Sequence, residues 1–312
     1  MVDCETVKAQ VHGPVMGLLT PFRDDGAIDF TSLARYVEHL VCAPLGVLAF
    51  SPMVSSTCVL TADEVLKVSA EVKQIAGDRA IVLATTRGDS PPETYDLVRS
   101  LEKHGVDGVF VFPGYFAPKP QIYVDLLTRC CQCTAMPIFG FQVSVEFDRR
   151  WGGLAWMNLD DWHRVAQCPQ IIGLKDDTGN LEARKAMIDR FGDRFNIVGP
   201  GMPERYVQIH HLPGQAELSL IAHLDVAQEL HFHARLASGD AEGAQVILRR
   251  ALDTVQRIRQ VAGTAWGIEP FHAIAHLRRL FETPTLRAPL PTLSNDQIKV
   301  IGRLLAQYDG EA

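Results

Sequence analysis

The stretch that decides the fold is Ile171-Ile172-Gly173-Leu174-Lys175-Asp176-Asp177-Thr178-Gly179-Asn180, an apolar run that ends in a lysine and turns at once into polar and glycine residues. Apolar character on both faces is typical of a strand in a parallel sheet that helices cover. The run therefore places the amine of Lys175 at the end of a strand. Loss of water around this amine favours its neutral form, which can attack a carbonyl carbon. A solvated lysine at a loop edge is the alternative interpretation.

Seven further apolar runs of similar length occur along the chain. They alternate with segments in which apolar residues recur at helical spacing, such as 33–41 and 65–75. Such alternation requires a parallel sheet with crossover helices, and eight units close a barrel. We therefore predict a (β/α)8 TIM barrel over residues 1–225, an α/β fold. The eight expected strands are 15–19, 46–50, 80–84, 108–112, 137–141, 171–174, 196–198 and a weaker run at 218–222.

The remaining residues, 226–312, are expected to form a helical extension packed on the barrel. Helical spacing of leucine and alanine continues over 226–261, 270–280 and 295–308, which predicts about three helices. The apolar surface of these helices is expected either to cover the barrel or to form an oligomer interface.

Composition and charge exclude several classes of protein. Hydrophobic residues make up 47% of the chain and charged residues 21%, as in a soluble globular protein. The net charge of −7 includes no basic block, so nucleic-acid binding is not expected. No stretch is long enough to span a bilayer, and the first residues lack the apolar core of a signal peptide or anchor. A cytoplasmic protein with no membrane partner is therefore expected.

The seven cysteines are an odd number scattered along the chain, which favours reduced thiols in the cytoplasm. Cys130-Cys131-Gln132-Cys133 is the one segment with the appearance of a metal site. It lies in an expected helix over 123–134 and lacks a second ligand pair at zinc-finger distance. We therefore expect no metal site at these cysteines.

The carboxyl ends of barrel strands carry the chemistry in this architecture, so the residues just after each run are the candidates. These residues are Thr20 after the first run, Ser51 to Thr57 after the second, Arg87 after the third, Tyr115 after the fourth, Gln142 to Glu146 after the fifth, and Lys175 to Asp177 after the sixth.

Five motifs give the chain its resemblance to a known family. They are GLLTPF at 17–22, LTADE at 60–64, HGVDGV at 104–109, PGYF at 113–116 and GLKDDTGN at 173–180. With these motifs the chain resembles the dihydrodipicolinate synthase and N-acetylneuraminate lyase superfamily of class I aldolases. The resemblance implies that Lys175 condenses with the ketone of a 2-keto acid such as pyruvate. The resulting iminium is the electron sink, so no cofactor is needed. It also implies a homo-oligomer, either a dimer or a tetramer built of dimers.

Several positions depart from the family pattern. The family's Gly-Thr-Thr-Gly-Glu loop, which seats the substrate carboxylate and supplies a hydroxyl, aligns with residues 52–56, where both threonines are absent. The tyrosine at the end of the fifth strand is Phe141, the second relay tyrosine is Phe116, and the arginine that binds a dicarboxylic partner is Glu146. A phenyl ring cannot transfer a proton. These departures argue against authentic dihydrodipicolinate synthase activity.

Other hydroxyl groups are candidates to replace the missing relay. Tyr115 is the preferred one, because a phenol both donates and accepts hydrogen bonds. Ser55, Ser56, Thr57 and Ser144 are the other candidates, and each is alternatively a hydroxyl that caps a turn or a helix. Five residues are expected to border the substrate: Thr20, Ser55, Ser56, Phe141 and Ser144.

The substrate carboxylate also needs a partner. Arg87 offers a planar fork of donors that suits a carboxylate. A surface ion pair with Asp89 or Glu93 is the alternative for Arg87.

Two features near the sixth and fifth strands stay open at this point. Asp176 and Asp177 are expected either to hold Lys175 or act as bases, or else to cap the helix that begins at Leu181. The long loop after the fifth strand contains Trp151 and Trp156, which are expected either to stack on a bulky aldehyde or to seal a subunit contact.

The sequence therefore predicts a Schiff-base-forming lyase that acts on a 2-keto acid, by an aldolase or a hydratase/dehydratase reaction. One alternative is a barrel that has lost turnover and binds a 2-keto acid as a sensor or regulatory protein. Another is that Lys175 acts as a base without forming an imine.

Overall fold

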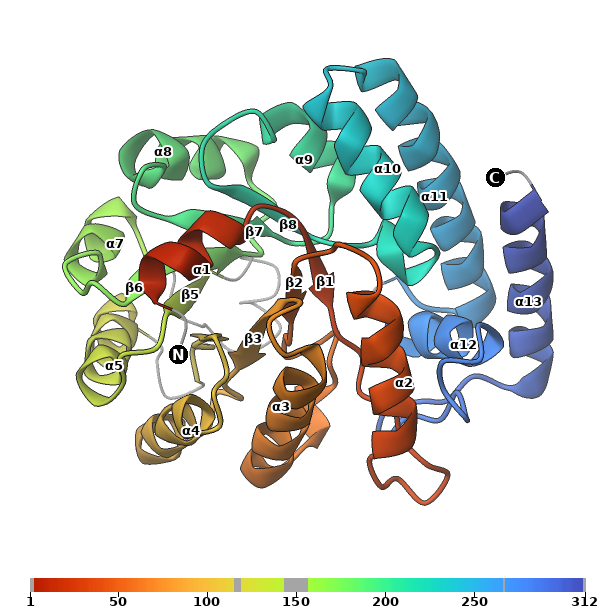
Figure 1. Cartoon of the computed structure of the whole chain (residues 1–312), viewed down its shortest axis with the longest axis horizontal. Helices are drawn as coiled ribbons and strands as arrows, with labels where there is room; N and C mark the ends of the chain where they lie inside the picture. Colours follow the sequence, from red (N-terminus) through yellow and green to blue (C-terminus); the bar gives the residue numbers. More distant parts are fainter. Residues whose placement is uncertain (1–2, 115–118, 143–156, 266, 311–312) are drawn as a thin grey trace.

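The computed structural model describes residues 3–114, 119–142, 157–265 and 267–310, and its strands form a closed parallel barrel (Figure 1). β1 closes the circle by pairing with β8. This confirms the predicted (β/α)8 barrel. The strands are β1 (Gly13–Gly17), β2 (Val47–Ala49), β3 (Ile81–Thr85), β4 (Gly108–Phe110), β5 (Ile138–Gln142), β6 (Ile171–Asp176), β7 (Asn196–Gly199) and β8 (Gln215–Leu218).

Crossover helices surround the strands and turn their apolar faces to the barrel. α3 is representative: Val65, Val68 and Val72 are buried, and a capping box between Thr61 and Glu64 fixes its first turn. The helices are α2 (Phe30–Val41), α3 (Ala62–Ala76), α4 (Pro91–Lys103), α5 (Pro120–Cys133), α7 (Leu159–Val165), α8 (Leu181–Phe191), α9 (Pro203–Ile209) and α10 (Val226–Ala237), with short 3₁₀ turns η1 (Thr57–Val59) and η2 (Ile221–His223).

The amino-terminal helix α1 (Cys4–Gln10) lies across the end of the barrel where the strands begin (Figure 1). Val7 and Val11 pack with the side chains that fill the barrel interior. The amide of Asn196, at the start of β7, donates to the carbonyl of Lys8 at 2.6 Å and to that of Val11. This end of the barrel is therefore filled, and the carboxyl ends of the strands face the opposite way.

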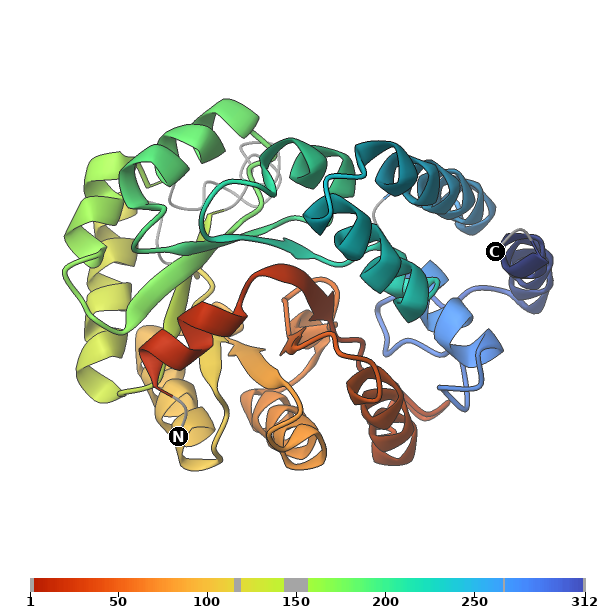
Figure 2. The same ribbon diagram turned by 45° about the horizontal axis from the view of Figure 1, so that its top comes forward.

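The carboxy-terminal helices gather on one side of the barrel (Figure 2). They are α10, α11 (Ala241–Ala262), α12 (Glu269–Leu277) and α13 (Asn295–Gly310), with α11 packed against α10 and α13. The prediction of one helix over 226–261 is wrong. Gly239 has a φ of +78° and ends the first helix, and Asp240 accepts a hydrogen bond from Gly243 N at 2.8 Å to begin the second.

The last strand also differs from its prediction, which placed it at 218–222. The strand was missed because Gln215 and Glu217 interrupt its apolar pattern. Both side chains are buried and accept hydrogen bonds, Gln215 from Arg184 and Glu217 from the amide of Met202. Ile221, Ala222 and His223, near the end of the predicted run, form the 3₁₀ turn η2 instead.

Arg287, in the segment between α12 and α13, connects the carboxy-terminal extension to the barrel. Its guanidinium donates to both carboxylate oxygens of Glu64 on α3, at 2.8 and 2.9 Å, and to the carbonyl of Gly26 at 2.7 Å. The hydrogen bonds from Arg287 lower the pKa of Glu64 to about 2. The ion pair therefore joins the segment after α12 to the side of the barrel.

Across the four described stretches of chain, no helix is both long enough and apolar enough to cross a membrane. Cys130 and Cys131 are buried within α5, and burial raises the pKa of both thiols. These two cysteines are therefore held as protonated packing residues.

Candidate active site

A bulge in β6 decides which way Lys175 points. Ile138 of β5 pairs with Ile171, but the next residue of β5, Phe139, pairs with Gly173, so β6 contains one extra residue here. Side chains alternate between the two faces of a strand, and an extra residue reverses every position after it. Phe141 points into the barrel and pairs with Lys175. The bulge therefore turns the lysine side chain inward.

Gly173 is required at this bulge. A Cβ at this position would lie 2.2 Å from the carbonyl oxygen of Asn196 and 2.7 Å from the ring of Phe139. Real Cβ atoms do not approach backbone oxygens so closely, so any side chain here would displace β6 from β7. The glycine thus keeps the lysine strand in register with both neighbours.

Lys175 lies at the carboxyl end of β6 and is 3% exposed. Its Nζ lies 5.1 Å from the centroid of the Phe141 ring, within range of a cation–π interaction. Nζ also donates a hydrogen bond to Oδ1 of Asp177. The amine is therefore enclosed between an aromatic face and a carboxylate.

The two aspartates after the lysine have different surroundings. Asp176 is 6% exposed and its Oδ1 accepts from Thr178 N at 3.1 Å, while burial raises the pKa of its carboxyl. The side chain of Asp177 is 31% exposed and contacts Lys175. Of the two alternatives, contact with Lys175 is therefore found for Asp177, and neither aspartate caps α8, because Asn180 accepts from the amides of residues 182 and 183 instead.

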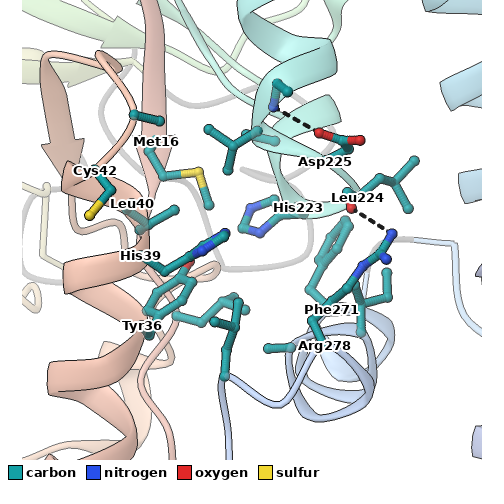
Figure 3. A pocket seen from close by; sticks show the side chains of 18 of the residues that line it. Met16, Tyr36, His39, Leu40, Cys42, His223, Leu224, Asp225, Phe271 and Arg278 are labelled. Atoms are coloured by element: carbon teal, nitrogen blue, oxygen red, sulfur yellow. Dashed lines mark hydrogen bonds between the residues drawn. The ribbon is translucent and has the colours of Figure 1, made fainter. Parts of the chain in front are cut away.

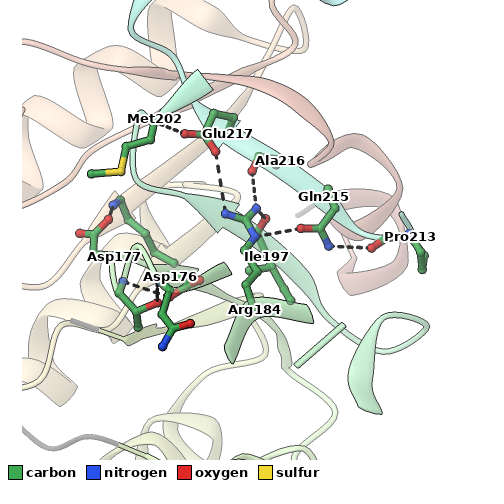
Figure 4. A network of polar contacts seen from close by, with 12 residues as sticks. Asp176, Asp177, Arg184, Ile197, Met202, Pro213, Gln215, Ala216 and Glu217 are labelled. Carbon is green, nitrogen blue, oxygen red and sulfur yellow. Dashed lines mark hydrogen bonds and ion pairs between the residues drawn. The ribbon is translucent and has the colours of Figure 1, made fainter. Parts of the chain in front are cut away.

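A buried polar network lies behind β6, β7 and β8 (Figure 4). Arg184 of α8 donates from Nε to Gln215 Oε1 at 3.0 Å and from Nη2 to two strand carbonyls at 3.0 and 3.1 Å. Its Nη1 lies 3.8 Å from Oε2 of Glu217. Sequence reasoning missed this pair, although an arginine on the inner face of a helix and a glutamate within a strand are both unusual.

Glu217 joins the network to the loop after β7. Its Oε1 accepts from Met202 N at 2.6 Å, and its Oε2 has no hydrogen-bond partner among the described residues. Burial raises the pKa of Glu217 to about 7, against the opposing effect of Arg184. The carboxyl is 3% exposed, so its ionised form is costly.

Two of the predicted hydroxyls are already engaged where the second-strand loop meets the end of β1: that of Thr20, which follows β1, and that of Ser55 on the loop. Thr20 Oγ1 donates to the carbonyl of Ser55 at 2.7 Å. Ser55 Oγ donates to the carbonyl of Leu18 at 2.6 Å and accepts from Ser51 N at 3.0 Å. These bonds fasten the loop to the end of β1. Both hydroxyl groups are therefore engaged in hydrogen bonds with backbone groups.

Ser56 differs from its neighbour. It is fully buried with a φ of +55°, a conformation that costs a non-glycine residue energy. Its hydroxyl caps no helix and has no hydrogen-bond partner among residues that the structure describes. The hydroxyl of Thr57 is also buried without a partner there. Ser56 and Thr57 thus each offer a buried hydroxyl that no described residue engages.

Arg87 follows β3 and forms the ion pair that the sequence left as its alternative. Nη2 lies 3.3 Å from Asp89 Oδ1, and the two side chains are 23% and 25% exposed. Its Nε is buried and has no partner in the described stretches. The guanidinium therefore retains a donor beyond the ion pair.

Two predicted residues, Tyr115 and Ser144, lie outside the described residues. The same is true of Glu146, Trp151 and Trp156 in the loop after β5.

A separate cavity of about 530 Å³ lies between α2, α10 and α12, and it includes none of the predicted site residues. Figure 3 shows Tyr36, His39, His223 and Phe271 around it. Burial lowers the pKa of His223 to about 4, so this imidazole is neutral near pH 7.

Comparisons with known proteins identify the family of the chain. The model of the Dihydrodipicolinate synthetase family matches residues 10–308. A 4-hydroxy-tetrahydrodipicolinate synthase of Laribacter hongkongensis is 27% identical over 94% of this chain and 98% of its own length. The synthase of Streptococcus mutans is 23% identical over 92% of this chain and 94% of its own length.

Solved structures have the same fold. The 4-hydroxy-tetrahydrodipicolinate synthase of Methylacidiphilum fumariolicum superposes with a TM-score of 0.82 at 18% identity, covering 96% of this chain and 97% of the other. The dihydrodipicolinate synthase of Thermotoga maritima also has a TM-score of 0.82, at 19% identity, covering 96% and 99%. From the family match over nearly its whole length, the chain belongs to the dihydrodipicolinate synthetase family.

Proposed function

We propose that this protein is a Schiff-base-forming lyase that acts on a 2-keto acid such as pyruvate, or on an aldol derived from it, with Lys175 as the nucleophile. The observation that carries the proposal is the inward-facing Lys175, 3% exposed, at the carboxyl end of β6. An inward-facing amine at the strand end can attack a bound ketone, and the phenyl ring and carboxylate beside it favour the positively charged iminium that results. The iminium replaces a cofactor as the electron sink.

We further propose that the reaction differs from that of the named relatives. Phe141 places a ring without a hydroxyl beside Nζ. On the second-strand loop, Val54 packs against the barrel interior, and its Cγ1 would lie 3.1 Å from a Cβ at Gly17. Both positions are apolar where the family resemblance implies hydroxyl groups. This supports a partner aldehyde with less polar character and a different proton relay.

In this proposal the carboxylate of the keto acid lies between the second- and third-strand loops. The unpartnered hydroxyls of Ser56 and Thr57 and the buried Nε of Arg87 are the free donors there. We also propose, on the family resemblance alone, a cytoplasmic homo-oligomer, which analytical ultracentrifugation would test.

A second candidate function is a keto-acid binder without turnover. It is favoured by the phenyl ring at Phe141 and by the hydroxyl of Ser55, which the loop backbone already engages. Such a protein would form the imine but release no aldol or dehydration product.

The test is borohydride reduction in the presence of pyruvate and a panel of longer 2-keto acids, read by intact mass and peptide mapping. We expect one stable adduct on Lys175. Lys175→Ala should abolish it, whereas Lys185→Ala, an exposed lysine on α8, should leave it unchanged. Absence of an adduct with every keto acid would refute the proposal. An adduct without product in turnover assays would favour the binder.

A further inference from the structure

We propose that Asp177 is the acid and base that forms the imine on Lys175, in place of the tyrosine hydroxyl that Phe141 lacks. The inference rests on the proposed function and adds a catalytic residue to it. Its starting point is that Nζ of Lys175 donates directly to Oδ1 of Asp177. In the described part of the chain no other donor is bound to this carboxylate.

A backbone hydrogen bond fixes the position of Asp177, so its side chain is not needed to hold this turn. Its amide donates to the carbonyl of Gln142, at the end of β5, at 2.7 Å. The rest of the turn is satisfied separately, because Asp176 accepts from Thr178 N and Thr178 Oγ1 accepts from Asn180 N, both at 3.1 Å. Asp176 is engaged within the turn, so the carboxylate of Asp177 is the acidic group of this turn that can exchange protons with Lys175.

Exposure distinguishes the lysine from its partner. The side chain of Lys175 is 4% exposed, and that of Asp177 is 31% exposed. The carboxylate thus lies on the outer side of the amine, where an incoming ketone and a departing water molecule would pass. A group in this position can contact both the nitrogen and the oxygen of the reacting centre.

The proton transfers balance with this single carboxylate. Asp177 first takes a proton from the ammonium of Lys175. The neutral amine then attacks the ketone carbon, forming the C–N bond while the carbonyl π pair moves to oxygen, and Asp177 protonates that oxygen. It next removes a second proton from nitrogen and delivers it to the hydroxyl. The C–O bond breaks, water leaves, and the nitrogen lone pair completes the iminium beside a regenerated carboxylate.

The neighbouring carboxylate provides a matched control. Asp176 is 6% exposed and faces Thr178, and burial already favours its protonated form, which an amide mimics. Asp176→Asn should therefore preserve the rate of imine formation. Asp177→Asn keeps the size of the side chain but removes the proton acceptor.

The test measures the rate of borohydride trapping with pyruvate in single-turnover experiments. We expect Asp177→Asn to lower the rate by about 10² to 10⁴-fold, with the adduct still on Lys175. We expect Asp177→Ala to regain rate on addition of formate, because a small carboxylate can occupy the partly exposed position. A purely structural role would show no such rescue.

The outcomes separate this inference from the proposed function. An adduct that forms at the wild-type rate in Asp177→Asn, with no formate rescue in Asp177→Ala, would overturn the role of Asp177 and leave the Schiff base intact. No adduct in the wild type would overturn both. Should the variants fail to fold, the pH profile of wild-type trapping decides. A rate that does not fall as carboxylates become protonated would overturn the inference.

Discussion

Replacing Glu217 with glutamine should change how the stability of this protein depends on pH. Burial raises the pKa of Glu217 from 4.5 to about 7. Between these two values the folded protein binds more protons than the unfolded chain, so the free energy of unfolding falls as pH rises. The contribution of the protonated Glu217 carboxyl to the free energy of unfolding is complete below pH 4.5 and is lost as pH rises through about 7. A shift of about 2.5 units corresponds to about 3 kcal/mol in total.

The side chain in Glu217→Gln cannot ionise, so the free energy of unfolding of this variant should not fall in this way as pH rises. Integrated from pH 5.5 to pH 8.5, the shift predicts a gain of about 2 kcal/mol for the variant relative to wild type. Glutamine keeps an acceptor for Met202 N, and Arg184 keeps its bonds to Gln215 and to two strand carbonyls. The comparison therefore isolates the cost of ionising one buried carboxyl.

The assay is urea-induced unfolding followed by tryptophan fluorescence and circular dichroism at half-unit steps of pH. Glu182→Gln, exposed on the same helix as Arg184, controls for the change in net charge. Groups unaffected by the substitution contribute equally to both proteins and cancel in the difference. A gap between Glu217→Gln and wild type that stays constant from pH 5.5 to 8.5 would show that the carboxyl is not shifted, and the reasoning would be wrong.

Three further variants test other parts of the structure. Gly173→Ala should lower the free energy of unfolding by about 1–3 kcal/mol, seen in thermal unfolding, because its Cβ would lie 2.2 Å from the carbonyl oxygen of Asn196. An unchanged melting temperature would contradict the bulge geometry. His272 is fully buried with both nitrogens unpartnered among described residues, and burial lowers its pKa to about 3. Stability is therefore lost as pH falls below 6.5, and His272→Phe should recover about 2–3 kcal/mol of it at pH 4.5 in urea titrations. If lowering the pH reduces the free energy of unfolding equally in both proteins, the shifted pKa of His272 is refuted. Arg287→Lys should cost about 1–2 kcal/mol, because an ammonium cannot bind both oxygens of Glu64. Chemical denaturation measures this, and a loss no larger than that of Lys299→Ala, at an exposed pair on α13, would argue against the tie.

The barrel was predictable because most of its strands are apolar runs and the segments between them have apolar residues at helical spacing. Val65, Val68 and Val72 of α3 are buried at the helical spacing seen in the sequence, and the run before Lys175 is buried throughout. These signals depend on a few adjacent residues. They remain readable without knowledge of distant partners.

The details that prediction missed depend on distant partners. The face on which Lys175 projects is set by pairing with β5, where one extra residue reverses the alternation. The eighth strand is polar at Gln215 and Glu217 because Arg184, from another helix, lies behind it. The engaged hydroxyl of Ser55 likewise depends on a carbonyl of β1. None of these contacts leaves a periodic signal in the local sequence.

The pairing of β1 with β8 has a consequence for synthesis of the chain on the ribosome. Gly13–Gly17 emerge early, but their partner at Gln215–Leu218 emerges only after every other strand. Helix α1 also waits, because Asn196 supplies its bonds to the barrel. Until then the sheet of the nascent chain has two open edges, at β1 and β7, and its apolar interior is not closed. The growing chain is therefore most prone to aggregate just before the last strand appears, and closure is expected to be a late, slow step.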